Sequence, residues 1–352
     1  MAGPIAPMIL LALGIALADG PGGDAPRDPA VNAARFQAWF DSARAGDLVI
    51  PPAIGRSAAC YRYVFIGGFG NEAMPGYFVQ NTREVRARGV PRGAIHSIFP
   101  SSHATIEDNA PKVRDRLREI AREGPEPLVI VAHSRGACDA LAFALADPEF
   151  VRDRVAALFL VQGPFGGTAL ADYVHGEGPE MDRRMPTRFR VVAHLVGRIE
   201  KGLIRRGKHG GLADLTREGS RRFWARMLEV HAGAVPIVGP KTYFLRAECA
   251  PAGLTRMLRS VGWYLKVYDG PNDGVVAVRD QYLPGFGTSL GVLECGHGDL
   301  TCRAGSDRPH RLLREAFIRC ILMTVGQAPM AVATRPEPAP RRPRLRLFGR
   351  AG

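Results

Sequence analysis

The chain has 352 residues, of which 46% are hydrophobic and 23% are charged, and this balance excludes a wholly disordered protein. Its 47 Lys and Arg outnumber its 34 Asp and Glu, which gives a formal net charge of +13. No apolar run reaches the roughly 18–20 residues that span a bilayer, so a bundle of membrane-spanning helices is not expected.

The chain begins with an apolar segment, residues 5–18, which ends in Ala16-Leu17-Ala18 before Asp19. Small residues at positions 16 and 18 fit a signal-peptidase site, so residues 1–18 are predicted to be a signal peptide and the protein to be secreted or periplasmic. A short membrane anchor or a buried helix is the alternative. Residues 19–59 form a Pro- and Gly-rich N-terminal extension with one predicted helix over 29–45.

From residue 60 to residue 326, apolar runs typical of strands alternate with helical patterns, which predicts an α/β domain. A helix over 109–121 has the capping-type Asn109 at its start and aligns Val113, Leu117 and Ile120 on one face. Strands are predicted at 61–66, 128–132, 155–161, 242–246, 263–267 and 290–293, and further helices at 135–145 and 309–325. This alternation predicts a mostly parallel sheet with helices on both faces.

The alternation is interrupted over about 165–240, where a charged and partly helical stretch is predicted to be a lid insertion. Six apolar residues there have nearly helical spacing and are suited either to cover an acyl site or to pack the lid itself: Val191, Leu195, Val196, Ile199, Leu203 and Ile204.

A buried strand runs into Ala132-His133-Ser134-Arg135-Gly136 and then into a helix. This is the pattern of a nucleophile elbow, in which small residues two before and two after the nucleophile relieve crowding at a tight turn. Ser134 is therefore the predicted nucleophile, and the Arg135 N–H at the helix start is a predicted oxyanion donor. The alternative is a serine that only caps the helix.

A serine nucleophile needs a base and an acid, which follow the elbow in the order acid and then histidine. His297 lies on a Gly-His-Gly turn after a strand, and Asp273 precedes it in a turn-rich loop. Asp273 and His297 are the predicted partners of Ser134, with Asp269 and Glu294 as competing acids. The segment Gly67-Gly68-Phe69-Gly70 follows a predicted strand and would supply a second oxyanion donor, the Phe69 N–H.

Six cysteines are an even number, which suits an oxidising compartment, and no CxxC pair is present to support a zinc ribbon. Cys295 and Cys302 are near enough in sequence to form a disulfide that closes one loop. Buried free thiols are the alternative, for Cys138 above all.

These motifs resemble those of the secreted bacterial triacylglycerol lipases of the α/β-hydrolase superfamily, over roughly residues 60–320. The resemblance rests on AHSRGA at the elbow, NDGVV at the acid and HGDL at the histidine. Residues 162–172 and 212–223 resemble two further segments of that group, Pro-x-x-Gly-x-x-x-Ala-Asp and Leu-Thr-x-x-Gly-x-x-x-Phe. The resemblance implies an α/β-hydrolase fold with a helical lid and a lipase-like activity.

The sequence departs from that group at two places. The oxyanion strand usually ends in His-Gly-hydrophobic, whereas Gly67-Gly68-Phe69 has no histidine. Many members bind a structural calcium through an Asp two residues after the catalytic histidine, which corresponds to Asp299. Arg303, a cation, replaces an amide often found four residues later, so Asp299 is a candidate calcium ligand that lacks this partner, and no other cofactor is predicted.

The predicted function is hydrolysis of acyl esters, with lipid esters as the expected substrates, through an acyl-enzyme on Ser134. A narrower carboxylesterase, a polyester depolymerase or an acyltransferase would use the same three residues. An alternative of another class is a non-catalytic protein that binds anionic surfaces on a hydrolase scaffold.

The positive charge is concentrated in two segments. Residues 176–226 carry 13 Lys and Arg against six Asp and Glu, and the Pro-rich tail at 327–352, predicted to be disordered, carries six Arg against one Glu. The rest of the chain is close to neutral, which argues against nucleic acid as a partner. A basic lid and tail would instead favour an anionic membrane or cell-envelope surface.

Overall fold

The computed structural model describes residues 29–74, 76–175, 211–255, 258–302 and 308–327. The predicted signal peptide, the six apolar lid residues and the basic tail from residue 328 lie outside this part of the chain. Among the helices described, none is long and apolar enough to cross a membrane.

Six strands form one sheet in the order β2-β1-β3-β4-β5-β6, and every pair of neighbours is parallel. The strands are β1 (Arg62–Ile66), β2 (Ile95–Ile98), β3 (Leu128–His133), β4 (Val155–Val161), β5 (Thr242–Glu248) and β6 (Thr288–Glu294). The central strand β3 is buried along its whole length because helices cover both of its faces. Since the strands are parallel, all their carboxyl ends lie at one edge of the sheet.

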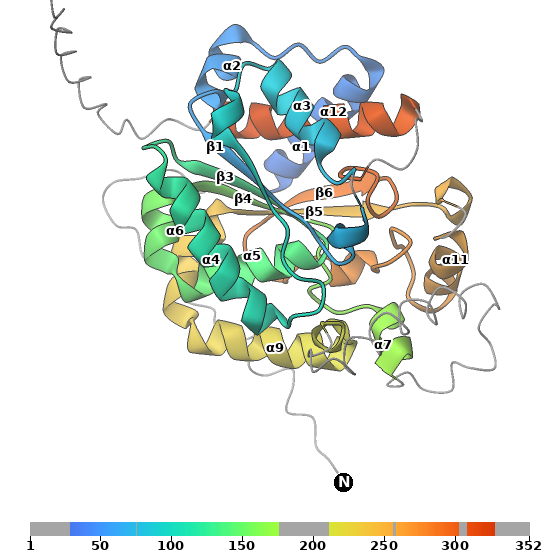
Figure 1. Cartoon of the computed structure of the whole chain (residues 1–352). Coiled ribbons are helices and arrows are strands. Elements are labelled where there is room, and N and C mark those ends of the chain that lie inside the picture. Colours follow the sequence, from blue (N-terminus) through green and yellow to red (C-terminus); the bar gives the residue numbers. More distant parts are fainter. Residues whose placement is uncertain (1–28, 75, 176–210, 256–257, 303–307, 328–352) are drawn as a thin grey trace, which may run out of the picture.

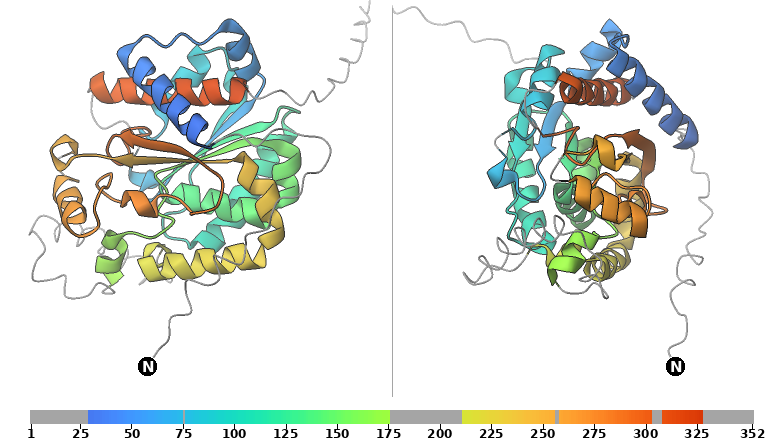
Figure 2. Two further views of the ribbon diagram at one scale, coloured as in Figure 1. Left: turned by 180° about the vertical axis from the view of Figure 1, so that it is seen from behind. Right: turned by 90° about the vertical axis from the view of Figure 1, so that its right-hand side faces the viewer.

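Helices pack on both faces of the sheet (Figures 1 and 2). The helices are α1 (Pro29–Ala45), α2 (Pro52–Ala58), α3 (Val79–Ala87), α4 (Ile106–Arg122), α5 (Arg135–Ala146), α6 (Pro148–Arg154), α7 (Ala169–His175), α9 (Arg217–Val230), α10 (Val235–Val238), α11 (Arg259–Tyr268) and α12 (Arg308–Gly326). In Figure 1, α1, α2, α3 and α12 lie above the sheet, and α4, α5, α6 and α9 lie below it. The prediction of an α/β fold with a parallel sheet and helices on both faces is confirmed.

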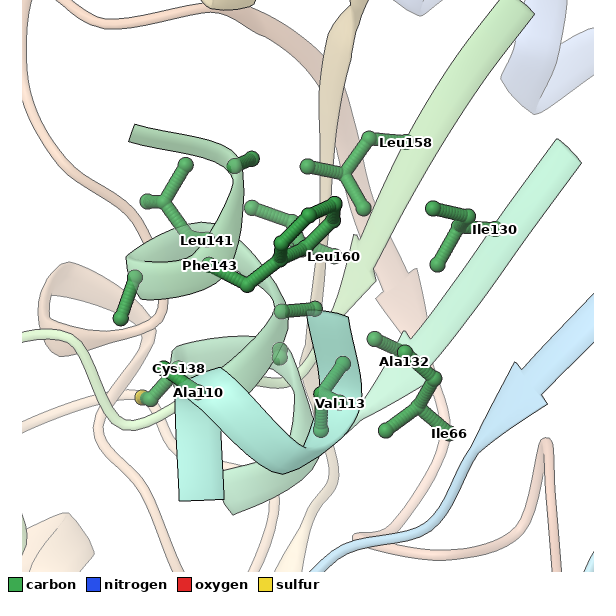
Figure 3. Packing of buried hydrophobic residues seen from close by; sticks show 14 of the residues in the cluster. Ile66, Ala110, Val113, Ile130, Ala132, Cys138, Leu141, Phe143, Leu158 and Leu160 are labelled. Atoms are coloured by element: carbon green, nitrogen blue, oxygen red, sulfur yellow. The ribbon is translucent and has the colours of Figure 1, made fainter. Parts of the chain in front are cut away.

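One face of the sheet packs against α4 and α5. Alternate strand residues such as Ile130, Ala132 and Leu160 meet Val113 of α4 and Phe143 of α5, and all are almost fully buried (Figure 3). Alternation along the strands sends every second side chain to this face. The resulting core fixes α5 directly behind the turn at Ser134.

The opposite face packs against α1, α3 and α12. Val129 and Val131 point to this side, where Phe36 and Phe40 of α1 and Phe317 of α12 are buried with them. Residues 29–58 of the predicted N-terminal extension thus supply two helices of this layer, and the helix predicted over 29–45 is confirmed.

Two secondary-structure predictions were wrong: the strand over 263–267 and the start of the helix predicted over 109–121. Residues 263–267 belong to helix α11, not to a strand, because the buried Val261, Tyr264 and Leu265 have helical spacing while Trp263 and Val267 are exposed.

Helix α4 begins three residues before Asn109, where the Thr105 hydroxyl accepts the Asp108 N–H and the Asp108 carboxylate accepts the Thr105 N–H. Asn109 is buried inside the helix and donates to the Ser101 carbonyl and the Asp139 carboxylate.

Candidate active site

Ser134 lies at the turn between β3 and α5, where its backbone has φ 55° and ψ −133°. A positive φ is unfavourable for a residue with a side chain and persists only where the surroundings enforce it. Gly68 makes room for this turn, since a β-carbon on it would lie 2.7 Å from the Ser134 β-carbon. The Ser134 side chain does not cap α5, so the alternative of a capping serine is wrong.

The structure brings Ser134, His297 and Asp273 into one hydrogen-bonded row at the carboxyl ends of the strands. The Ser134 Oγ lies 2.9 Å from His297 Nε2, and His297 Nδ1 lies 2.8 Å from Asp273 Oδ2. The His297 backbone N–H also donates to the Asp273 carbonyl at 2.7 Å. Because an ionised carboxylate only accepts, Nδ1 carries the proton and Nε2 is free to accept one from Ser134.

The Asp273 carboxylate is fully buried, and hydrogen-bond donors surround it. Its Oδ1 accepts the backbone N–H groups of Val275 and Val276 at 2.9 and 2.8 Å. Its Oδ2 accepts from the Gln162 side-chain amide at 3.0 Å as well as from His297. These four donors stabilise the charged form of the buried acid and fix the direction in which it faces His297.

The two competing acids lie elsewhere. Asp269, at the end of α11, is ion-paired with Arg217 and, at 2.9 Å, with Arg279. Glu294 is an exposed residue at the end of β6. Of the three candidate acids, Asp273 is the one hydrogen-bonded to His297 in the described structure.

Two backbone N–H groups flank Ser134 as predicted oxyanion donors. The Arg135 N–H belongs to the first turn of α5, where backbone N–H groups have no acceptor within the helix. In the Gly67–Gly70 loop, the N–H groups of Gly67, Gly68 and Gly70 donate to the Ile98 carbonyl, the Tyr77 hydroxyl and the Ser102 hydroxyl. Within the described residues the Phe69 N–H is left without an acceptor, so it is available to a ligand.

The Arg135 side chain, which the sequence did not single out, joins the elbow to the loop at 101–104. The guanidinium is buried and donates to the Ser102 carbonyl at 2.9 Å and to the Ala104 carbonyl. The Ser102 hydroxyl in turn accepts the Gly70 N–H and donates to Glu72. The two segments that carry the predicted oxyanion donors, the start of α5 and the loop at 67–70, are therefore both hydrogen-bonded to the loop at 101–104.

Asp139 lies one helical turn after Arg135, with Oδ1 4.0 Å from the guanidinium Nε. Burial raises the pKa of the Asp139 carboxyl to about 7, although Arg135 and the hydrogen bond from Asn109 oppose the rise. A buried group of this kind titrates near neutrality but does not touch the Ser134 row.

A second set of residues that the sequence analysis missed lies behind Ser134 and Asp273. His133 is buried, with Nδ1 2.5 Å from the Tyr77 hydroxyl and Nε2 3.2 Å from the Gln162 amide oxygen. The position of Gln162 directly after a predicted strand was a signal, but nothing in the sequence indicated its contact with Asp273.

Asp299 does not fit a calcium site. Its Oδ2 accepts the Gly296 N–H at 2.8 Å and its Oδ1 lies 3.5 Å from His310. The carbonyl oxygens of Asp299 and Cys302 accept from the buried guanidinium of Arg314 at 3.3 and 2.8 Å. The positively charged Arg314 side chain thus already occupies the carbonyl oxygens that a calcium ion would need. Among the described residues, no cluster of three His, Cys, Asp or Glu side chains could hold a metal ion.

All six cysteines are free thiols in the structure, so the predicted Cys295–Cys302 disulfide is wrong. Cys295 is buried in the core between the sheet and α12, whereas Cys302 lies past the histidine turn, 3.9 Å from the Met74 sulfur. Burial raises the pKa of both thiols.

No model of a known protein family and no curated protein matches the chain. Solved structures that are similar to it in fold include a lipase and a carboxyl esterase. The mature lipase BlEst2 of Bacillus licheniformis is 16% identical with a TM-score of 0.55, and the match covers 76% of this chain and 91% of the lipase. The metagenomic carboxyl esterase MGS0156 is 21% identical with a TM-score of 0.53, and 76% of each chain is covered. Together with the parallel sheet and its two helical layers, these matches show that the chain has the α/β-hydrolase fold.

Proposed function

We propose that this protein is a serine-dependent carboxylic ester hydrolase that works through an acyl-enzyme. The observation that carries the proposal is the row Ser134–His297–Asp273 at a strained turn, flanked by the N–H groups of Phe69 and Arg135. The fold it shares with a lipase and a carboxyl esterase supports the same reaction class.

In the proposed mechanism, Ser134 Oγ attacks the ester carbonyl while His297 Nε2 takes its proton. The negative charge that develops on the carbonyl oxygen is stabilised by the N–H groups of Phe69 and Arg135. His297 then gives the proton to the leaving alcohol. Water attacks the acyl-enzyme by the same route, and Asp273 orients and stabilises the imidazolium in both halves.

The surroundings of the loop at 67–70 favour an acyl ester with an apolar chain. Phe99 and Met74 are half-exposed, and their side chains lie against Gly67 and Gly70, where a β-carbon would be 2.8 Å from Phe99 Cδ1 and 3.2 Å from Met74 Cε. The partly buried Phe69 packs against the core beside them. An acyl chain that extends from Ser134 toward this side would contact an apolar surface, which favours lipid esters as substrates.

The test is hydrolysis of nitrophenyl esters from acetate to palmitate by the wild-type protein and by Ser134→Ala. We expect activity that rises toward longer chains and falls by about a million-fold, into the background, in the variant. A preference for acetate and butyrate would favour a narrower carboxylesterase. Capture of the acyl group by added alcohol would favour an acyltransferase. An inactive wild type that binds anionic vesicles would favour the non-catalytic alternative.

A further inference from the structure

Three polar residues behind the site connect the loop at 67–70, which we call the oxyanion loop, to the acid Asp273. They are Tyr77, His133 and Gln162. Tyr77 precedes α3, His133 ends β3 and Gln162 directly follows β4, so three separate elements bring them together. All three are buried, and Tyr77 and Gln162 contact the two nitrogens of the His133 ring.

The partners of Gln162 determine where the protons of this group lie. Its amide nitrogen faces two acceptors, Asp273 Oδ2 at 3.0 Å and the Gly296 carbonyl at 3.3 Å, so its oxygen faces His133. The His133 Nε2 must therefore carry a proton and donate it to that oxygen. Neutral His133 then has a lone pair on Nδ1, which accepts the Tyr77 hydroxyl proton.

The Tyr77 hydroxyl also accepts a hydrogen bond, from the Gly68 N–H at 2.9 Å. Every donor in the series thus points the same way, from Gly68 through Tyr77, His133 and Gln162 to the Asp273 carboxylate. The side chains of Thr301 and Cys302 also interact with this hydroxyl. Hydrogen bonds aligned in one direction polarise and strengthen one another in a low-dielectric interior.

His133 must remain neutral for the series to hold. Its ring lies 4.9 Å from the ring of His297, which becomes a cation during the proposed reaction. Burial and this neighbour lower the pKa of His133 well below its ordinary value. The groups that face it are Tyr77, Gln162 and His297, and no carboxylate touches it directly in the described structure.

We propose that Tyr77, His133 and Gln162 are positioning residues that hold the Gly67–Gly68 peptide, next to the oxyanion donor Phe69, in register with the Asp273 carboxylate. This inference rests on the proposed hydrolase function. Gln162 donates to Asp273 Oδ2, the same oxygen that accepts from His297. Tyr77 accepts the N–H of the peptide next to the oxyanion donor. His133 joins Tyr77 to Gln162. None of the three touches the substrate.

The experiment compares Gln162→Met, Tyr77→Phe and the double variant in single-turnover and steady-state ester hydrolysis. Each single change removes a hydrogen bond that acts on a charged group or on the oxyanion loop, so kcat should fall about 10- to 100-fold with KM within twofold. Because both residues act through His133, the double variant should lose much less than the product of the two single losses.

Thr242→Val is the matched control, because it removes one buried hydrogen bond, to the Val238 carbonyl, at the opposite end of β5. It should lower the urea midpoint as the test variants do but leave kcat unchanged. Losses of kcat that multiply in the double variant, or a kcat in the single variants equal to that of Thr242→Val, would overturn the inference. An inactive wild type, or full activity in Ser134→Ala, would instead overturn the proposed function itself.

Discussion

Gly136 of the elbow helix lies directly against the carbonyl oxygen of Gly67, and a β-carbon on Gly136 would overlap that oxygen. The backbone behind the nucleophile therefore touches the backbone of the oxyanion loop. We predict that Gly136→Ala forces the two segments apart, destabilises the fold by about 1–3 kcal/mol and lowers kcat, because overpacking against backbone is not relieved by a rotamer change.

The control for this prediction is Gly233→Ala, because no atom lies within 4 Å of a β-carbon at that position. Urea unfolding and ester hydrolysis measured on both variants separate the effect of contact from that of added volume. Equal stability and equal activity for the two variants would contradict the close approach at Gly136.

Asp273 and Asp269 offer a direct comparison of the proposed catalytic acid with a competing one. Asp273→Asn keeps the shape of the side chain but favours the wrong tautomer of His297, so kcat should fall about 10⁴-fold. Asp269→Asn removes ion pairs with Arg217 and Arg279 and should change kcat by no more than a few-fold. The kcat values for one ester decide between them, and a larger loss in Asp269→Asn would reverse the assignment of the acid.

Most of the strands and the nucleophile elbow could be predicted from the sequence because those features depend on neighbouring residues. The run at 128–132 is uniformly apolar and leads into a crowded turn at Ser134, and both properties follow from the order of residues alone. The short edge strand β2 escaped prediction because Ile95–Ile98 contains His and Ser and is only partly buried. Residues 263–267 were wrongly predicted to be a strand because aromatic and β-branched residues favour strands. In the structure, the packing of α11 makes them helical.

The site was only partly predictable for a related reason. Ser134, Asp273 and His297 could be chosen from their motifs and their order along the chain. The contact of Gln162 with Asp273 spans 111 positions and that of Tyr77 with His133 spans 56, and no local pattern encodes either. Contacts of this kind exist only once the parallel strands bring their carboxyl ends together.

Asp139 should make stability depend on pH. Its pKa is raised from 3.8 to about 7 in the folded protein, so the folded state holds this proton over a range in which the unfolded chain has lost it. The stabilisation is complete below about pH 4 and is lost as the pH rises toward about 7. We predict that Asp139→Asn, which stays neutral, becomes more stable relative to the wild type by on the order of 3 kcal/mol between pH 4 and pH 8.

Urea unfolding of both proteins at the two pH values measures this difference. Asp115→Asn, at an exposed position on α4, provides the matched control and should show no such change. A difference between Asp139→Asn and the wild type that is the same at pH 4 and pH 8 would rule out a raised pKa at Asp139.

The turn after His297 should not depend on calcium, because the Arg314 guanidinium already binds its carbonyl oxygens. We predict that treatment with EDTA changes neither the melting temperature nor the ester hydrolysis rate. Arg314→Met, which removes that guanidinium, should lower the melting temperature. An increase in melting temperature when calcium is added to the wild type would show that the site at Asp299 accepts the ion after all.

The central claim, that Ser134 is a nucleophile activated by His297, is tested most directly by covalent labelling. The protein is incubated with diethyl 4-nitrophenyl phosphate, and the site and amount of phosphorylation are read by peptide mass spectrometry. We predict one label per chain, on Ser134, and labelling that is slowed at least about 1,000-fold in His297→Ala. Labelling of another residue, or labelling of Ser134 at the same rate without His297, would contradict the account.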